Sequence, residues 1–497
     1  MERQQDDGKK LEASSTKKRT RFYSAGESAG FLGWDVQNVS ADTAIYANLN
    51  KVKARCRDLA RNNDYVRNAI RTIISNVVGP DGYRLQCKHR CGEGADKEFN
   101  RRIERAWVSA GKIKNSPTVC AKLSRIDSAQ LWWQSLLVDG EVIEVDHPAF
   151  TGNKYRYATQ FVDSARLDWR LNKNLSNGHA IRMGVEVDAL GKPVAYWFLN
   201  NDPTEYIWGH ANTSAEHTRV PAERVRHTFI QESIGQTRGI PQIASPAVRA
   251  HMLQRFEEAV VVGARVAASK VGFYTTTDDY QGEAPGDEDD EYQLSHTHEP
   301  GTFDMLPRGV EVQSFDPSSP QIGCNEFSKS MLKGVASGII GADYVSMAND
   351  LEGVNYSSIR AGQLEQRSIY KALQKFYMER CLEPQFERWL NIQLFNADVQ
   401  LDSRKVTRLL MDECYRFIGR GWTWVDPLKE VKAYGEAIDR RLTSRRRIVA
   451  ETLGEDYDEL LDEIEEDEKA LSARGLLMAV VNGQQVPVEA DEEEVEE

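Results

Sequence analysis

The chain has 497 residues, a net charge of −13 and 40% hydrophobic residues, a composition that predicts a folded protein of about three domains. Its longest apolar run, at 259–272, is interrupted by Arg265 and Lys270 and is shorter than the roughly 20 residues that span a bilayer, so no transmembrane helix and no membrane partner are expected. The acidic balance excludes a protein that binds nucleic acid over its whole surface, and any such contact must be local or weak. The charged first residues lack the apolar core of a secretory signal, which predicts an intracellular protein.

Two amphipathic helices are predicted after a flexible basic arm at 1–24. Ser40 is a plausible helix cap, and apolar residues follow it at helical spacing as far as Ala60. A second helix is expected over 64–78, where Gly79-Pro80 ends the apolar pattern.

The region 80–240 is predicted to be mainly β structure with helices packed on it. The apolar stretch 131–145 contains Asp139-Gly140, a dipeptide typical of type I′ turns, so a hairpin is expected there. Residues 181–187 and 193–199 alternate apolar and polar side chains and indicate another hairpin with one buried face.

Two long helices separated by a small β insertion are predicted next. The first, of nearly thirty residues, should follow Pro241, and the second should cover about 322–340. The insertion holds an acidic run at 278–291, which favours a solvated loop, and a short hairpin of 302–306 with 310–315. Glycine costs up to about 1 kcal/mol relative to alanine inside a helix. Three glycines interleaved with the second helix therefore indicate close packing on a neighbouring backbone: Gly334, Gly338 and Gly341.

The C-terminal third is predicted to be helical. A loop at 342–355 leads to a long helix capped by Ser357-Ser358, which Pro384 should kink or divide. Asp426-Pro427 is typical of a helix start, and further helices are expected from about Ser444 and over 457–473. Seven of the last nine residues are acidic, which favours a disordered tail.

Metal and catalytic motifs are weak in this sequence. The seven cysteines are an odd, scattered set and are expected to be free thiols. Cys87 and Cys91, perhaps with His296 and His298, are the strongest metal-like cluster, but zinc sites need paired short spacings and no second pair has one, so a surface loop is the favoured interpretation. The chain has no phosphate-binding glycine loop, nucleophile elbow or HExxH helix, so no enzyme, metal or cofactor is expected.

A series of short blocks keeps a fixed order along the chain. It includes Asp139-Gly-Glu-Val142 and Gly235-Gln-Thr-Arg-Gly-Ile-Pro241, and the other blocks are at 57–65, 76–79, 84–86, 184–188, 191–196, 299–301, 354–358 and 424–427. In content and order these blocks resemble the lambda-type portal proteins of tailed phages, over roughly residues 20–475.

This resemblance implies an α+β fold, in the form of an elongated portal-type subunit that forms a ring. Its expected parts, in chain order, are a wing (25–240), a stem helix (241–270), a small α/β clip (271–320), a second stem helix (321–341), a tunnel loop (342–355), a wing long helix and return (356–425) and a helical crown (426–475). The basic arm and an acidic disordered tail at 476–497 lie outside the resemblance.

The resemblance also implies a function. Such subunits form a homo-oligomeric ring, typically a dodecamer, at one capsid vertex of the virion, where double-stranded DNA is packaged and ejected. The ring assembles in the host cytoplasm, and the expected partners are the large terminase subunit, the head-tail adaptor, and the major capsid and scaffold proteins. Two alternatives stay open: a virion-associated metal-dependent nuclease or protease that uses Cys87, Cys91, His296 and His298, and a monomeric scaffold or adaptor that forms no ring.

Candidate DNA-channel residues follow from the same resemblance. The tunnel loop contains no lysine or arginine and should touch DNA only weakly through Asp343, Ser346, Met347, Asn349, Asp350, Glu352, Gly353 and Asn355. An acidic wall of this kind repels phosphates and lets DNA slide. The possible phosphate contacts are Lys329, Lys333 and Arg360, and an inter-subunit salt bridge is an equal alternative for each.

Overall fold

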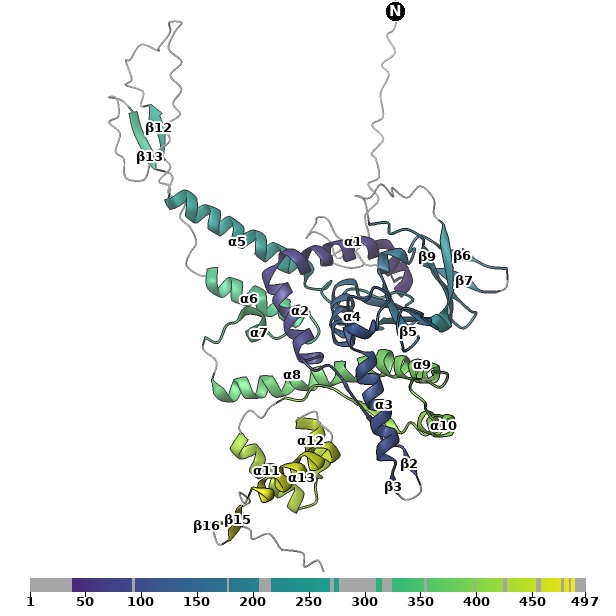
Figure 1. Cartoon of the computed structure of the whole chain (residues 1–497). Helices are drawn as coiled ribbons and strands as arrows, with labels where there is room; N and C mark the ends of the chain where they lie inside the picture. The colour runs from purple at the N-terminus through teal and green to yellow at the C-terminus, as the bar shows by residue number, and fades with distance from the viewer. Residues whose placement is uncertain are drawn as a thin grey trace, which may run out of the picture.

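The computed structural model describes residues 38–91, 94–176, 178–204, 216–268, 272–276, 310–314, 324–352, 355–396, 398–422, 427–452, 457–474, 478–481 and 484–487. These residues form a mixed α+β body from which a pair of helices projects (Figure 1). The predicted basic arm lies outside the described residues.

The first two helices confirm the sequence prediction. Helix α1 (Ala41–Asn62) is capped by Ser40, whose Oγ accepts from Thr43 N at 3.3 Å. Helix α2 (Asp64–Val77) follows after Asn63, whose side chain accepts from Val66 N at 3.0 Å. Both helices bury an apolar face in the main core, as the periodicity of their sequences requires.

The hairpin predicted at 131–145 is wrong. Residues up to Asp139 belong to helix α4 (Arg125–Asp139), Gly140 is its left-handed C-cap with φ 81°, and strand β4 (Glu141–Pro148) begins directly after it. An Asp-Gly pair suits a helix end as well as a tight turn. Packing in the core favours the helix over the hairpin, because Trp132, Trp133 and Leu136 are fully buried together on one helical face.

The two largest described sheets of the body are antiparallel. The three-stranded sheet has the order β11 (Val225–Phe229), β4 and β5 (Tyr157–Val162). The five-stranded sheet has the order β10 (His217–Pro221), β9 (Pro193–Leu199), β8 (Val185–Val187), β7 (Ala180–Arg182) and β6 (Lys173–Asn174). The β8–β9 pairing confirms the second predicted hairpin, but its first strand is split in two, because Met183 and Gly184 adopt positive φ angles of 48° and 84°.

The main core joins distant parts of the chain. Helix α3 (Lys97–Ala110) contributes Trp107, whose ring lies 5.3 Å from Phe386 and 5.1 Å from Trp389 of helix α9 (Glu383–Gln393). Helix α9 continues helix α8 (Tyr356–Tyr377) after a π-helical turn at Met378–Leu382, so the predicted division near Pro384 is confirmed. The outer part of the body is completed by strand β1 (Arg84–Cys87), its partner β14 (Tyr415–Ile418), the short hairpin β2 (Arg90–Cys91) and β3 (Gly94–Ala95), and helix α10 (Ser403–Met411).

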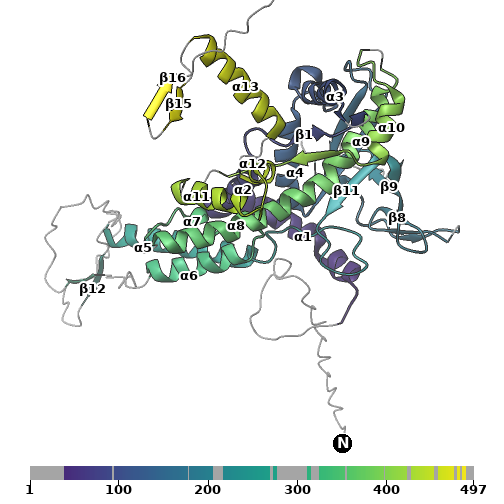
Figure 2. The ribbon, with the colours of Figure 1, turned by 90° about the horizontal axis from the view of Figure 1, so that it is seen from below.

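The helical projection consists of α5 (Ala247–Ala268) and α6 (Cys324–Ser337), which lie side by side and point away from the sheets (Figure 2). Strands β12 (Gly272–Thr276) and β13 (Val310–Ser314) pair with each other beyond the end of α5. Helix α5 begins after Pro246 rather than after Pro241, and the residues directly after Ala268, at 269–271, lie outside the described residues. The partner of β13 in the structure is β12, whereas the predicted partner at 302–306 lies outside the described residues.

The C-terminal helices are α11 (Pro427–Asp439), α12 (Arg445–Thr452) and α13 (Tyr457–Ala473), all near their predicted positions. The prediction that the chain is disordered from residue 476 is wrong for residues 478–481 and 484–487. Strands β15 (Met478–Val481) and β16 (Gln484–Pro487) form an antiparallel pair there, and the strongly acidic end at 488–497 lies outside the described residues.

Candidate functional site

Gly334 of α6, and Gly338 and Gly341 shortly after its end, pack against side chains of the same chain. A side chain at Gly334 would meet Nη1 of Arg249 at 1.8 Å, and one at Gly338 would meet the ring of Pro246 at 3.0 Å. Gly341 has a φ of 76° and lies against Leu373 of α8. The predicted close packing is present at these glycines, but the nearest neighbouring atoms belong to side chains of the same chain rather than to a backbone.

The segment predicted as a tunnel loop contains a short helix. Helix α7 (Tyr344–Ala348) is capped by Asp343, whose Oδ2 accepts from Ser346 N at 3.0 Å. Asn349 ends it in the left-handed conformation with φ 52°. The segment 342–352, named the α7 segment below, is thus locally structured, and the expectation of an irregular loop is corrected. Gly353, which was expected to give the loop its freedom, lies outside the described residues.

The α7 segment is held against helix α2. Nδ2 of Asn68 donates to the carbonyl oxygens of Ser346 and Met347, both at 2.9 Å. Met347 is only 2% exposed and belongs to the main core. Its side chain is an anchor, and the prediction that it lines a DNA channel is wrong. Gln366 of α8 donates to the carbonyl oxygen of Gly341 and holds the other end of the segment.

The acids of the α7 segment are engaged within the chain. Nζ of Lys329 on α6 lies 3.1 Å from Asp350 and 2.5 Å from Glu352, and the hydroxyl of Tyr344 donates to Asp350 at 2.5 Å. These bonds raise the pKa of Lys329. Tyr344, the backbone N–H of Glu352 and Lys329 together lower the pKa of Asp350 from 3.8 to about 2. This contact therefore stabilises the folded segment above about pH 4 and is lost as the pH falls through about 2.

The predicted phosphate contacts have different surroundings. Lys329 forms the ion pairs just described, with Asp350 and Glu352 of the same chain. Nζ of Lys333 lies 5.4 Å from the ring centre of Tyr344, and Arg360 is partly buried on α8. Asn355 precedes α8, and its carbonyl oxygen accepts from Ile359 N at 3.0 Å.

The sequence blocks at 139–142 and 235–241 meet in a buried ion network. Glu141 is 1% exposed, and its carboxylate accepts from Arg238 at 2.5 Å, from Lys53 at 2.6 Å and from the backbone N–H of Gly239 at 3.0 Å. His227 Nε2 lies 2.9 Å from the same carboxylate. The blocks also touch through their backbones, because a Cβ at Gly140 would lie 2.0 Å from the carbonyl carbon of Ile240.

The charged groups of this network are buried away from water and stabilise one another. Burial alone would raise the pKa of Glu141, but the charges of Arg238 and Lys53 outweigh it and keep the pKa well below its usual range. Burial lowers the pKa of His227, which favours the neutral ring. In the sequence, these two blocks stand out only as part of the family signature. The only sequence signal for their pairing is the presence of charged residues inside otherwise apolar or glycine-rich blocks, and Glu141 and Arg238 are 97 positions apart in the chain.

The cysteine–histidine cluster is not a surface loop. Cys87 ends strand β1 and is buried, and His89 is 4% exposed, with its ring 5.2 Å from Phe99. Within the described part of the chain, no three His, Cys, Asp or Glu side chains gather as metal ligands would. Six cysteines there are free thiols: Cys56, Cys87, Cys120, Cys324, Cys381 and Cys414. His296 and His298 lie outside that part. No described helix has the length and apolar character needed to cross a membrane.

Comparisons with known proteins agree on one class, the portal proteins of phages. Residues 28–374 match the family described as phage portal protein, lambda family. The chain is 31% identical over 441 residues to a probable portal protein of Halomonas phage phiHAP-1, which covers 88% of this chain and 83% of that protein. It is 24% identical to portal protein B of Escherichia phage lambda, over 88% of this chain and 87% of that protein. The chain therefore belongs to the lambda family of phage portal proteins.

Distant structural similarity extends to gene transfer agents. A chain from the neck of an empty GTA particle has a TM-score of 0.42 and 12% identity, and the match covers 80% of this chain and 92% of that chain. A chain from the virion of a native gene transfer agent has a TM-score of 0.43 and 11% identity, with the same coverage. Members of this family are structural proteins of the virion that form rings at a capsid vertex.

Proposed function

We propose that the chain forms a ring, typically of twelve subunits, through which double-stranded DNA enters and leaves the capsid. The observation that carries this proposal is the match to the portal family across residues 28–374, a span that includes the body, the helical projection and the α7 segment. The net charge of −13 per subunit supports it, since an acidic channel wall repels DNA phosphates and keeps sliding friction low.

The parts of the subunit are assigned from their shapes. We assign α5 and α6 to the stem, β12 and β13 to the clip, α11 to α13 to the crown, and the remaining body to the wing (Figure 1). Exposed apolar side chains on the stem helices and α8 support contact with a neighbouring subunit, because a monomer gains nothing from exposing them. They are Met252, Val261, Val262, Phe327, Leu364 and Ile369.

Within this ring the α7 segment would act as a collar that narrows the channel and helps to retain packaged DNA. Two features of the α7 segment support this role: part of it is anchored on the body, and the rest is polar and exposed. Met347 and Asn68 hold α7 on the body, whereas Ser346 and Glu352 remain exposed and carry no positive charge that would bind phosphate.

The collar assignment predicts a specific defect for Met347→Ala. Truncating a buried methionine costs about 2–5 kcal/mol, enough to release α7 from α2 while the larger core keeps the body folded. Rings should form and packaging should begin, yet heads should lose DNA, measured as the fraction of DNase-resistant filled heads. The control is Met411→Ala, which changes a methionine that is 78% exposed on α10. Normal yields of stably filled heads from Met347→Ala would show that another part of the subunit retains DNA.

The clip would bind the large terminase subunit during packaging and the head-tail adaptor afterwards. Thr275→Pro places a residue without an N–H in the middle of β12, opposite Glu311 of β13, and should disrupt the pairing of these strands. We expect intact rings that capture several-fold less terminase in a pull-down assay. Full capture of both terminase and adaptor by this variant would remove the clip from the proposal.

A direct image separates the proposed function from the alternatives. Negative-stain microscopy of the purified protein should show rings with a central hole. A monomer would favour the adaptor hypothesis, and metal-dependent nuclease or protease activity in the same preparation would favour the enzyme hypothesis.

A further inference from the structure

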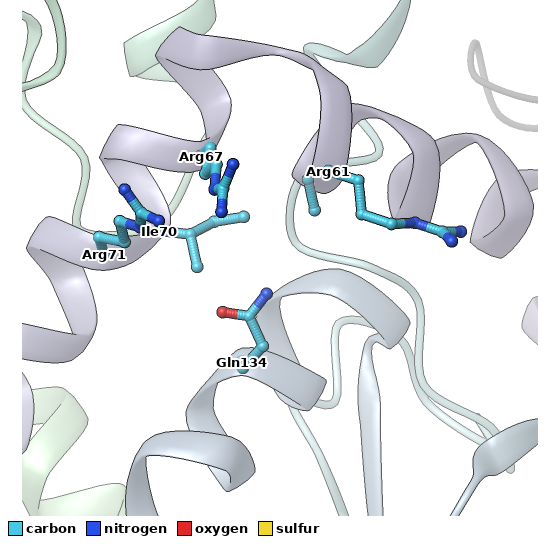
Figure 3. A pocket seen from close by; sticks show the side chains of 6 residues that line it. Arg61, Arg67, Ile70, Arg71 and Gln134 are labelled. Atoms are coloured by element: carbon cyan, nitrogen blue, oxygen red, sulfur yellow. The ribbon is translucent and has the colours of Figure 1, made fainter.

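A concave pocket lies where helices α1, α2 and α4 meet, and none of the roles discussed above uses it. Its volume is about 340 Å³. Its lining comes from three helices and consists of Ala60, Arg61, Arg67, Ile70, Arg71 and Gln134 (Figure 3).

The polar groups of this pocket converge from two walls. Arg67 and Arg71 are one turn apart on α2 and place their guanidinium groups on the same side, beside Ile70 (Figure 3). The amide of Gln134 on α4 points toward them from the opposite wall. Arg61 stands at the rim with its guanidinium turned away, and its Nε donates to the carbonyl oxygen of Arg57 at 3.0 Å.

The two convergent arginines have no acid to balance them. Across the described ranges, no carboxylate lies within ion-pair distance of Arg67 or Arg71, and the Gln134 side chain has no hydrogen-bond partner. Two like charges one turn apart on a helix destabilise it slightly. The subunit as a whole has a net charge of −13, so this pocket is a positively charged site on an acidic protein. A bound anion would remove the repulsion and use all three side chains as donors.

We propose that this pocket binds a phosphate group of the DNA backbone. The proposal rests on the proposed function, because it needs double-stranded DNA within reach of the subunit. Guanidinium groups bind phosphate in a bidentate manner, and a neutral amide adds a further donor. Helix α2 connects the pocket to the proposed collar, since it carries Arg67 and Arg71 of the pocket and also Asn68, whose side chain holds α7. A single phosphate contact in this pocket would fix the position of the DNA next to the collar, while the rest of the acidic wall repels the DNA.

The test compares DNA binding by matched charge variants of the full-length protein. Binding of a short fluorescent duplex is measured by anisotropy over a range of salt concentrations. For Arg67→Gln/Arg71→Gln we expect about tenfold weaker binding and a slope of log affinity against log salt that is smaller by about 1. The control Arg102→Gln/Arg105→Gln removes the same charge from exposed arginines of α3 outside the pocket and should change neither value comparably. Arg67→Lys/Arg71→Lys should keep the salt slope but lose part of the affinity.

The possible outcomes decide the proposal. Competition by inorganic phosphate that is seen with the wild type and lost in Arg67→Gln/Arg71→Gln would support a phosphate site. Equal weakening by the pocket and control variants would show only general charge attraction and would overturn it. Duplex binding unaffected by the pocket variant, or pocket-dependent binding of an acidic peptide in place of the duplex, would overturn it as well. The assay also works on unassembled subunits. A failure to form rings would therefore count against the proposed function, and the effect of the pocket variant on duplex binding could still be interpreted.

Discussion

Val262→Glu is expected to abolish ring assembly. Val262 is 55% exposed on α5, and in the proposed ring its side chain would be covered by the neighbouring subunit. The change removes about 1.5 kcal/mol of apolar burial and places a carboxylate in an apolar contact, where its desolvation costs more than the lost burial. A closed ring repeats this loss at every subunit contact. Sedimentation velocity should therefore show monomers or short open arcs instead of a single large species.

The control for this prediction is Val108→Glu on α3. Val108 is 54% exposed, so the chemical change and the exposure in the subunit are nearly the same, but the position lies outside the projection. This variant should assemble normally, and both proteins should melt at similar temperatures. Complete rings from Val262→Glu would place the subunit contact on another surface and would remove α5 from it.

Glu141→Gln is expected to destabilise the body more than any exposed substitution. Glutamine has nearly the same size as glutamate, so the change removes the charge while keeping the packing. Lys53 and Arg238 would then share the buried site with no carboxylate between them, and breaking a buried ion network in this way costs about 3–5 kcal/mol. Because Glu141 joins α1, β4 and the 238–239 segment, unfolding by denaturant should begin at a clearly lower concentration.

The matched control is Glu352→Gln, which also removes one carboxylate from a lysine pair. Glu352 is 77% exposed in its side chain, and such surface pairs contribute about 0–1 kcal/mol. The two variants should therefore differ by several kcal/mol in the free energy of unfolding. Equal stabilities would mean that Lys53 and Arg238 find other partners or water when Glu141 is neutral.

Local signals in the sequence determined the helices that bury one continuous face. Caps and apolar spacing located α1, α2 and α13 almost to the residue, because these features act within one or two turns of the chain. The short ordered blocks also indicated the portal family, which the comparisons confirmed. Both kinds of information are carried by residues that are close together in the sequence.

Tertiary structure decided everything that depends on residues far apart. Asp139-Gly140 is compatible with a hairpin and with a helix end, and only the burial of Trp132 and Trp133 in a core shared with α8 selected the helix. Gly334 and Gly338 indicate close packing, but the sequence does not show which residues pack on them. In the structure these are Arg249 and Pro246 of the same chain.

The candidate site shows the same division. The sequence identified Lys329 and the acids of the α7 segment as charged residues near one another in the chain, but it could not show that they pair with each other. It also could not show that Glu141 binds Arg238, or that Arg67 and Gln134 line the same pocket. Such contacts form because folding brings separate helices and strands within a few ångströms, and the free energy of an ion pair depends on that distance and on burial, neither of which is written in the order of the residues.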